Sequence, residues 1–324
     1  MALSFFDLPF LSLNHQNRHQ RKRCLTPFLL FLLLANCADS IENNLGLGSE
    51  KSMVYIMKKK HKHAKILDCE SIESTYKSLE AILGVKRDKL QQVFDSLDIY
   101  KAFWEEKKYY SFTSPDDLLL SYVKERTCCK TEFDAICGFH CTRTLPGNTF
   151  ADGLLPLHQS IDKIWDYLFT LVEEQFTTQQ WTNLRDSISS SDNRFAYQYN
   201  LKFRDINAHD GPWAWLIKEA GICNGAYLTI SEIVEDICWY CSDIFNKIDL
   251  RKLYIDSTVP CIIKFVDYIA PTNALSAAME YVYNRHRNPD ALGGPDYGFS
   301  AGKIIPKDQI LMVEFPICEP NLSS

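Results

Sequence analysis

The stretch from Val259 to Val266 constrains the fold of this 324-residue chain more than any other. It is almost wholly apolar and rich in β-branched side chains. Residues of this kind favour extended backbone, and a continuous apolar run cannot leave one face in water. We therefore expect a buried central strand here, with other elements packed around it.

Helical patterns precede this strand. Apolar residues recur at three- and four-residue spacings after Ser71, and again from Leu90 to Leu97. Gly84 is the expected end of the first helix. Ser114 followed by Pro115 has the form of an N-cap before a first-turn proline, which predicts a third helix. We interpret this part as a helical layer that supports or covers the C-terminal two thirds of the chain.

Short strands and helices alternate in the rest of the chain. We expect helices over 161–172, 213–221, 230–245 and 274–283, and strands over 194–199, 259–266 and 309–315. Helices that come first, followed by mixed elements, indicate an α+β fold. The expected organisation is a signal-like segment at 1–52, a helical region at 53–130 and an α+β domain at 131–324.

The N-terminal segment resembles a targeting sequence. A basic run from Arg18 to Arg23 precedes an apolar run from Leu25 to Ala35, and small or polar residues come after it. The apolar run is too short for a bilayer, which needs about 20 residues, so we expect no stable membrane span. The protein is secreted or periplasmic if this segment is a signal, and cytoplasmic if translation starts at Met53 or Met57.

Composition narrows the function classes. The formal net charge of −6 argues against a nucleic-acid binder that relies on its global charge. No phosphate-binding loop and no Gly-x-Gly-x-x-Gly pattern is present. The 41 acidic residues offer many carboxylate pairs, and none stands out as a hydrolase site.

The 12 cysteines allow two further interpretations. Candidate zinc ligands are close in the sequence at Cys128, Cys129, Cys137, His140 and Cys141. The pair Cys238 and Cys241 also has a ligand spacing, but it lies in an apolar pattern that core packing explains. A Cys141–His140 nucleophile is disfavoured, because neighbours on a strand point to opposite faces. We therefore assign no metal ligands.

The stretch from Gly138 to Arg143 is the strongest candidate for a functional site. On a strand, His140 and Thr142 would share one face, and Cys141 and Arg143 the other. A polar strand end before a loop and Gly153 is compatible with a ligand site, and equally with a strand that simply ends.

Phe139-His140-Cys141-Thr142-Arg143, with Gly153-Leu154 ten residues on, resembles the first motif of the ADP-ribosyltransferase-like fold. The similarity is to the branch of diphtheria toxin and the poly(ADP-ribose) polymerases, and to bacterial proteins with a Phe-His-Cys-Thr-Arg stretch. Cys141 stands where that family usually has Gly. The stretch that begins at Asp296 and runs past Pro306 is similar to the family's C-terminal layout. The resemblance covers roughly residues 131–324 and implies a split β-sheet.

The resemblance also implies a chemistry, the cleavage of the nicotinamide–ribose bond of NAD as co-substrate. His140 would bind a ribose hydroxyl, Tyr227 on a strand would stack on nicotinamide, and Asp296 would be the catalytic acid. Tyr197 and Tyr199 are alternatives for the stacking residue. Thr142, Arg143 and Gly153 would complete the cofactor site, with Arg143 on a phosphate. ADP-ribose would pass to a protein, a nucleic acid, a small molecule or water.

Two other functions stay open from the sequence. One is a ligand-binding or protein-interaction module on the same scaffold without catalysis. The other is a secreted protein stabilised by zinc or disulfides. Nothing in the sequence indicates the oligomeric state.

Overall fold

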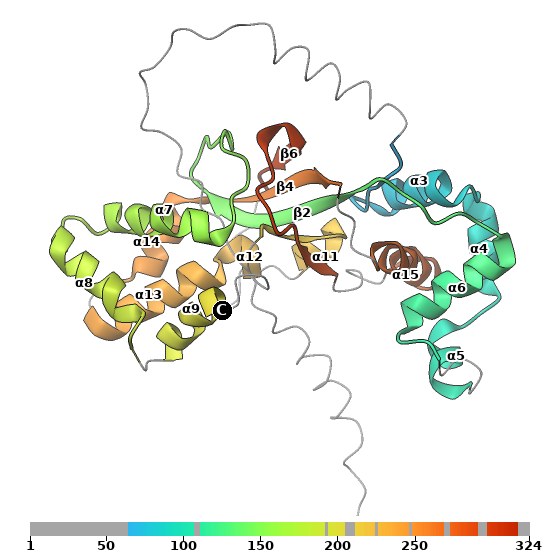
Figure 1. Cartoon of the computed structure of the whole chain (residues 1–324), viewed down its shortest axis with the longest axis horizontal. Coiled ribbons are helices and arrows are strands. Elements are labelled where there is room, and N and C mark those ends of the chain that lie inside the picture. Colours follow the sequence, from blue (N-terminus) through green and yellow to red (C-terminus); the bar gives the residue numbers. More distant parts are fainter. Residues whose placement is uncertain are drawn as a thin grey trace, which may run out of the picture.

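A six-stranded sheet forms the middle of the molecule (Figure 1). The structure, a computed structural model, describes residues 64–106, 111–191, 194–204, 211–223, 226–245, 248–268, 273–290 and 297–316. The sheet has the order β5-β3-β2-β4-β6, with β1 paired in parallel to the start of β2. Its strands are β1 (Ile66–Leu67), β2 (Ala135–Thr144), β3 (Trp213–Trp215), β4 (Val259–Asp267), β5 (Gly298–Ser300) and β6 (Ile310–Glu314).

Strands β2 and β4 form the centre of this sheet. They pair antiparallel from Ile136 opposite Asp267 to Thr144 opposite Val259. Every residue of β2 is buried, and so is every residue of β4 from Cys261 onward. The apolar run at 259–266 therefore forms the buried central strand that the sequence predicts.

One group of helices packs at the β1 end of the sheet, on the right in Figure 1. It shares a continuous hydrophobic core with β2 and β4. Ser71 and Ser114 cap two of its helices, and Gly84 ends the first with a φ of 70°. The group consists of α3 (Ile72–Leu83), α4 (Arg87–Asp95), α5 (Ile99–Glu105), α6 (Pro115–Thr127) and α15 (Ala274–Arg287).

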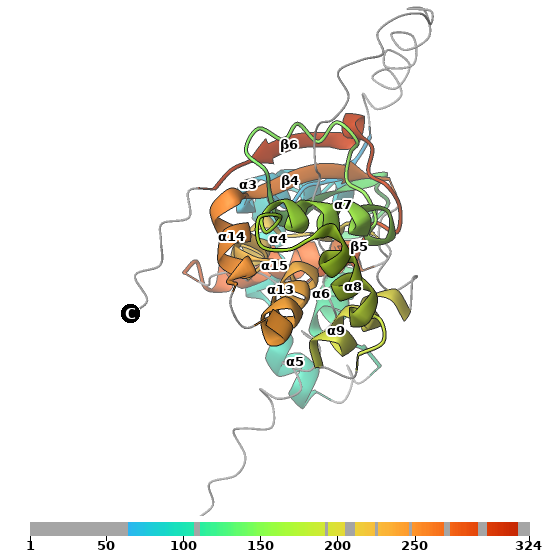
Figure 2. The same cartoon turned by 90° about the vertical axis from the view of Figure 1, so that its left-hand side faces the viewer.

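A second group of helices packs at the other end, on the left in Figure 1 and nearest the viewer in Figure 2. It encloses a hydrophobic cluster of its own around Trp165, Trp181 and Tyr254. The group consists of α7 (Leu157–Thr170), α8 (Thr178–Ile188), α9 (Arg194–Arg204), α13 (Glu232–Phe245) and α14 (Leu250–Ser257).

Short elements fill the space between the two groups. Helices α11 (Lys218–Cys223) and α12 (Ala226–Thr229) both contact β2. The 3-10 turn η2 (Lys307–Gln309) leads into β6. Helices around a mainly antiparallel sheet confirm the α+β class, whereas the ADP-ribosyltransferase-like fold stays a prediction.

Two of the elements predicted from hydrophobic patterns are wrong. Residues 194–199 form the first part of helix α9, not a strand, because Ala196, Tyr199 and Lys202 recur at three-residue spacings and are buried. Residues 213–215 form strand β3, not a helix, because β2 and β5 pair with them on either side. The helix begins only at Lys218.

The predicted signal-like segment at 1–52 lies outside the described residues. Within the described ranges, no helix is long and apolar enough to cross a bilayer.

Candidate functional site

The two faces of β2 carry the alternation that the sequence predicts. Cys141 lies against α11, since a Cβ added to Gly221 would come within 3.0 Å of its Sγ. Arg143 points the same way, toward α12 and α14. His140 and Thr142 belong to the opposite face, where they are 1% and 0% exposed.

His140 is held as a neutral imidazole. Its Nδ1 lies 2.6 Å from the carbonyl oxygen of Trp213 on β3. Burial lowers the pKa of His140 to about 4, against the smaller opposing effect of this hydrogen bond. A carbonyl only accepts, so Nδ1 carries the proton and Nε2 is an acceptor nitrogen. The ring is therefore fixed in tautomer and orientation at neutral pH.

The same face of β2 continues as a row of polar side chains. Thr142 and Thr144 are both fully buried. Asn148, in the loop after β2, donates to Thr144 Oγ1 at 2.6 Å and accepts from the amide of Phe150 at 2.9 Å. This loop is thereby fixed above the strand.

Arg143 ties together the ends of two helices. Its Nη1 donates to the Leu228 carbonyl in α12 at 2.9 Å, and its Nη2 donates to the Ile255 carbonyl in α14 at 2.8 Å. Its Nε and Nη2 also donate to Oγ1 and the carbonyl of Thr258, at 2.9 and 2.7 Å. Helix C-termini carry unsatisfied carbonyls and partial negative charge, which suits a guanidinium. Arg143 thus acts here as a helix cap, on the face opposite His140.

Gly153 is required by a close backbone contact. Its φ is 77°, and a Cβ added to it would lie 2.2 Å from the Ile305 carbonyl oxygen. Leu154 and Ile305 exchange two backbone hydrogen bonds, of 2.8 and 3.0 Å. The Gly153-Leu154 pair is therefore joined to the Ile305-Pro306 segment that carries the other half of the family resemblance.

Cys141 is not an activated nucleophile. Burial raises the pKa of its thiol to about 12, so the thiol stays protonated at neutral pH. It also lies on the face opposite His140. The nine cysteines in the described ranges are all free thiols.

In the described part of the chain, no three His, Cys, Asp or Glu side chains lie close enough together to hold a metal ion. These residues therefore contain no ligand set for zinc. Cys238 and Cys241 are buried on α13, as core packing predicts, and burial raises the pKa of both thiols.

The remaining predicted site residues are not brought together by the described structure. Tyr227 lies in helix α12 rather than on a strand, which corrects that expectation, and its side chain lies outside the described part. Tyr197 and Tyr199 lie on α9, and Tyr199 is buried with its hydroxyl 3.1 Å from Trp165 Nε1. Asp296 lies outside the described residues.

A charged cluster on the Cys141 face of the sheet escaped the sequence analysis. Lys264 on β4 contacts Asp68 and Glu70 at 2.6 Å each, and its Nζ lies 5.8 Å from the Phe139 ring centre. Lys218 joins Glu70 to Glu314 on β6. The available signal was Lys264 itself, since a lysine within a buried apolar strand requires a partner.

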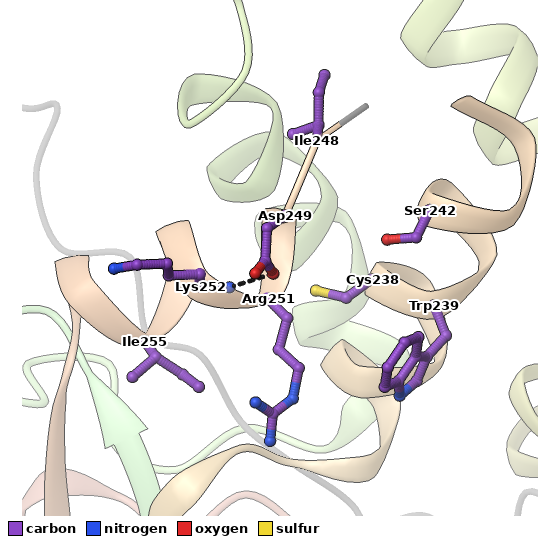
Figure 3. A pocket seen from close by; sticks show the side chains of 8 residues that line it. All are labelled: Cys238, Trp239, Ser242, Ile248, Asp249, Arg251, Lys252 and Ile255. Carbon is purple, nitrogen blue, oxygen red and sulfur yellow. Dashed lines mark hydrogen bonds between the residues drawn. The ribbon is translucent and has the colours of Figure 1, made fainter. Parts of the chain in front are cut away.

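An open hollow of about 670 Å³ lies between α13 and α14 (Figure 3). Trp239 and Arg251 line it, with Cys238 at its base. Asp249 caps α14 by accepting from the amide of Lys252 at 2.9 Å. Among the predicted site residues that the structure describes, none lines this hollow.

The arrangement on β2 offers a fixed neutral imidazole beside two threonines and a tethered loop, in a closed interior. Such a group can accept a hydrogen bond from a hydroxyl without competing for a proton at neutral pH. Comparison with known proteins adds no constraint, since no protein-family model, curated protein or solved structure matches this chain.

Proposed function

We propose that this protein is ADP-ribosyltransferase-like and binds NAD on the His140–Thr142 face of β2. The observation that carries the proposal is the fixed tautomer of His140, with Nδ1 on the Trp213 carbonyl and Nε2 as an acceptor. A ribose hydroxyl is a donor of the matching kind. The contact between Gly153-Leu154 and Ile305 supports it, because the two sequence stretches that suggested the family are hydrogen-bonded to each other.

The proposed reaction is substitution at the anomeric carbon of the nicotinamide ribose. The bond between this carbon and the nicotinamide nitrogen breaks, and nicotinamide leaves as a neutral molecule. An acceptor hydroxyl, amine or water forms the new bond and loses a proton. Asp296 would stabilise the positive charge that develops on the ribose, and Tyr227 would stack on the leaving ring. We do not assign Arg143 to a phosphate of NAD, because its guanidinium already donates hydrogen bonds to α12, α14 and Thr258.

A non-catalytic module on the same scaffold is the second candidate. It is favoured by the burial of His140 and Thr142, which are at most 1% exposed. In that function the polar row on β2 would serve the interior of the protein, and binding would take place elsewhere on its surface.

Incubation of the full chain with NAD separates the two candidates. Melting temperature reports NAD binding, and chromatography reports released nicotinamide. The first candidate predicts that NAD raises the melting temperature and that nicotinamide accumulates. Both effects should be lost in His140→Gln and kept in His158→Gln, which changes an exposed histidine on α7.

Asp296→Asn tests the acid separately, since it should abolish nicotinamide release while NAD still raises the melting temperature. Wild-type protein that neither gains stability with NAD nor releases nicotinamide would leave the second candidate standing.

A further inference from the structure

A smaller hollow lies where α3, α4 and α15 meet, well separated in sequence from β2. Its volume is about 290 Å³. Arg87, Arg285 and His286 line it, together with the ring of Tyr76 and the amide of Gln91. We refer to it as the α3–α15 cleft.

The charges of this cleft are one-sided. None of the described residues that line it is an acid, while three of them are basic. Their carboxylate partners stand outside the lining. Arg87 Nη1 contacts Glu73 at 2.8 Å, and His286 Nε2 contacts Asp95 at 2.8 Å. Charges of one sign on the walls of a hollow raise the local concentration of counter-ions.

The Arg87–Glu73 and His286–Asp95 pairs have exposed carboxylates, because the side chains of Glu73 and Asp95 are 60% and 66% exposed. Arg285 lies 3.5 Å from Glu219 in a partly buried pair, which an anion in the cleft can leave in place. Exposed pairs contribute little to stability, so an incoming anion with two or more charges can replace them.

The donors are also held in place. The guanidinium carbon of Arg87 lies 4.1 Å from the centre of the Tyr76 ring, which is itself 3% exposed. A stacked guanidinium presents its planar fork edge-on, in the orientation for two parallel hydrogen bonds to one anion. Arg285 leaves the last turn of α15 and lines the same cleft.

We propose that the α3–α15 cleft binds a small phosphate-bearing anion, with Arg87 and Arg285 as its main ligands. The volume of about 290 Å³ admits one or two phosphate groups. The hollow between α13 and α14 differs in that the carboxylate of Asp249 is part of its lining.

Calorimetric titration of the full chain with inorganic pyrophosphate, at constant ionic strength, tests the proposal. Wild-type protein should show saturable binding of one pyrophosphate, and a titration with inorganic phosphate should show the same site with lower affinity. Arg87→Gln should weaken pyrophosphate binding at least about tenfold, because a charge-assisted pair is lost. Arg285→Lys, which keeps the charge and removes the fork, should weaken it several-fold.

Lys86→Gln is the matched control. It removes the same charge one residue away, from a side chain that is 87% exposed and outside the cleft, and should leave binding unchanged. Equal weakening in Arg87→Gln and Lys86→Gln, or no saturable binding by wild-type protein, would overturn the proposal. Nicotinamide release from NAD should persist in Arg87→Gln, so the two proposals fail or stand independently.

Discussion

His140 and Trp213 are joined across neighbouring strands by a hydrogen bond of 2.6 Å between an imidazole nitrogen and a carbonyl oxygen. The bond fixes which ring nitrogen carries the proton, and burial keeps the ring neutral. Protonation of the buried ring would therefore cost the folded protein more than it costs the unfolded chain.

His140 should make stability depend on pH. Its pKa is about 4 in the folded protein, below the ordinary value of about 6.5, so the unfolded chain binds the proton more readily. Stability should therefore fall as pH drops below about 6.5, by roughly 2 kcal/mol between pH 7 and pH 5 from this residue. Urea unfolding at both pH values measures the loss.

Comparison with variants assigns this loss to His140. His140→Gln should lose about 2 kcal/mol less than wild type over the same interval, since it has no imidazole to protonate. His158→Gln should follow the wild-type curve. Parallel curves for wild type and His140→Gln would show that burial does not depress the pKa of His140.

Arg143 should be a stability residue. Its removal leaves buried carbonyls of α12 and α14 without a donor, so Arg143→Ala should destabilise the fold by about 3–5 kcal/mol. Arg143→Lys should recover only part of this, because an ammonium cannot reach all the acceptors at once. Denaturant midpoints give the values. A stable Arg143→Ala that fails to bind NAD would instead assign Arg143 to the ligand.

Alanine substitutions at Gly153 and Gly147 can separate the cost of a steric clash from the cost of backbone strain. Both have positive φ, of 77° and 81°, but a Cβ would strike the Ile305 carbonyl only at Gly153. Gly147→Ala should cost about 1 kcal/mol from strain alone. Gly153→Ala should cost at least about 2 kcal/mol more, because the Leu154–Ile305 contact has to open. Equal costs by thermal or chemical unfolding would contradict the contact.

Lys264 should hold the connection between β1 and α3 on the sheet. Lys264→Met leaves Asp68 and Glu70 facing a buried apolar strand, and should destabilise the protein by about 2–4 kcal/mol at pH 7. The pKa of Glu70 is lowered chiefly by its hydrogen bond to Lys264, so this stabilisation is present above the ordinary Glu pKa and disappears as pH falls through the lowered value.

The difference between Lys264→Met and wild type should accordingly shrink in acid, as unfolding at pH 7 and pH 3 would show. Lys252→Met, which breaks an exposed pair with Asp256, should leave the midpoint unchanged. A difference that stays constant with pH would mean that Lys264 acts through packing alone.

Elements with a long hydrophobic pattern, or with chemically marked ends, can be predicted from the sequence alone. Ser71, Ser114 and Gly84 mark helix ends by side-chain capping and by positive φ, and both effects act within a few residues. The run at 259–266 is apolar for long enough to require a buried strand. The alternation on β2 follows from strand geometry alone.

Short elements, whose conformation depends on the strands and helices packed beside them, cannot be predicted in this way. Residues 213–215 are a strand because β2 and β5 pair with them on either side. Helix α9 forms because Ala196 and Tyr199 pack into the hydrophobic cluster of the second group of helices. Tertiary structure also decided the roles of two polar residues. Arg143 donates to carbonyls that are 85 and 112 positions away in the sequence. Lys264 contacts acids that are 196 and 194 positions away. No local sequence pattern encodes contacts over such separations. A buried charge is satisfied by whatever the fold brings next to it, so its partners are fixed only when the chain has folded.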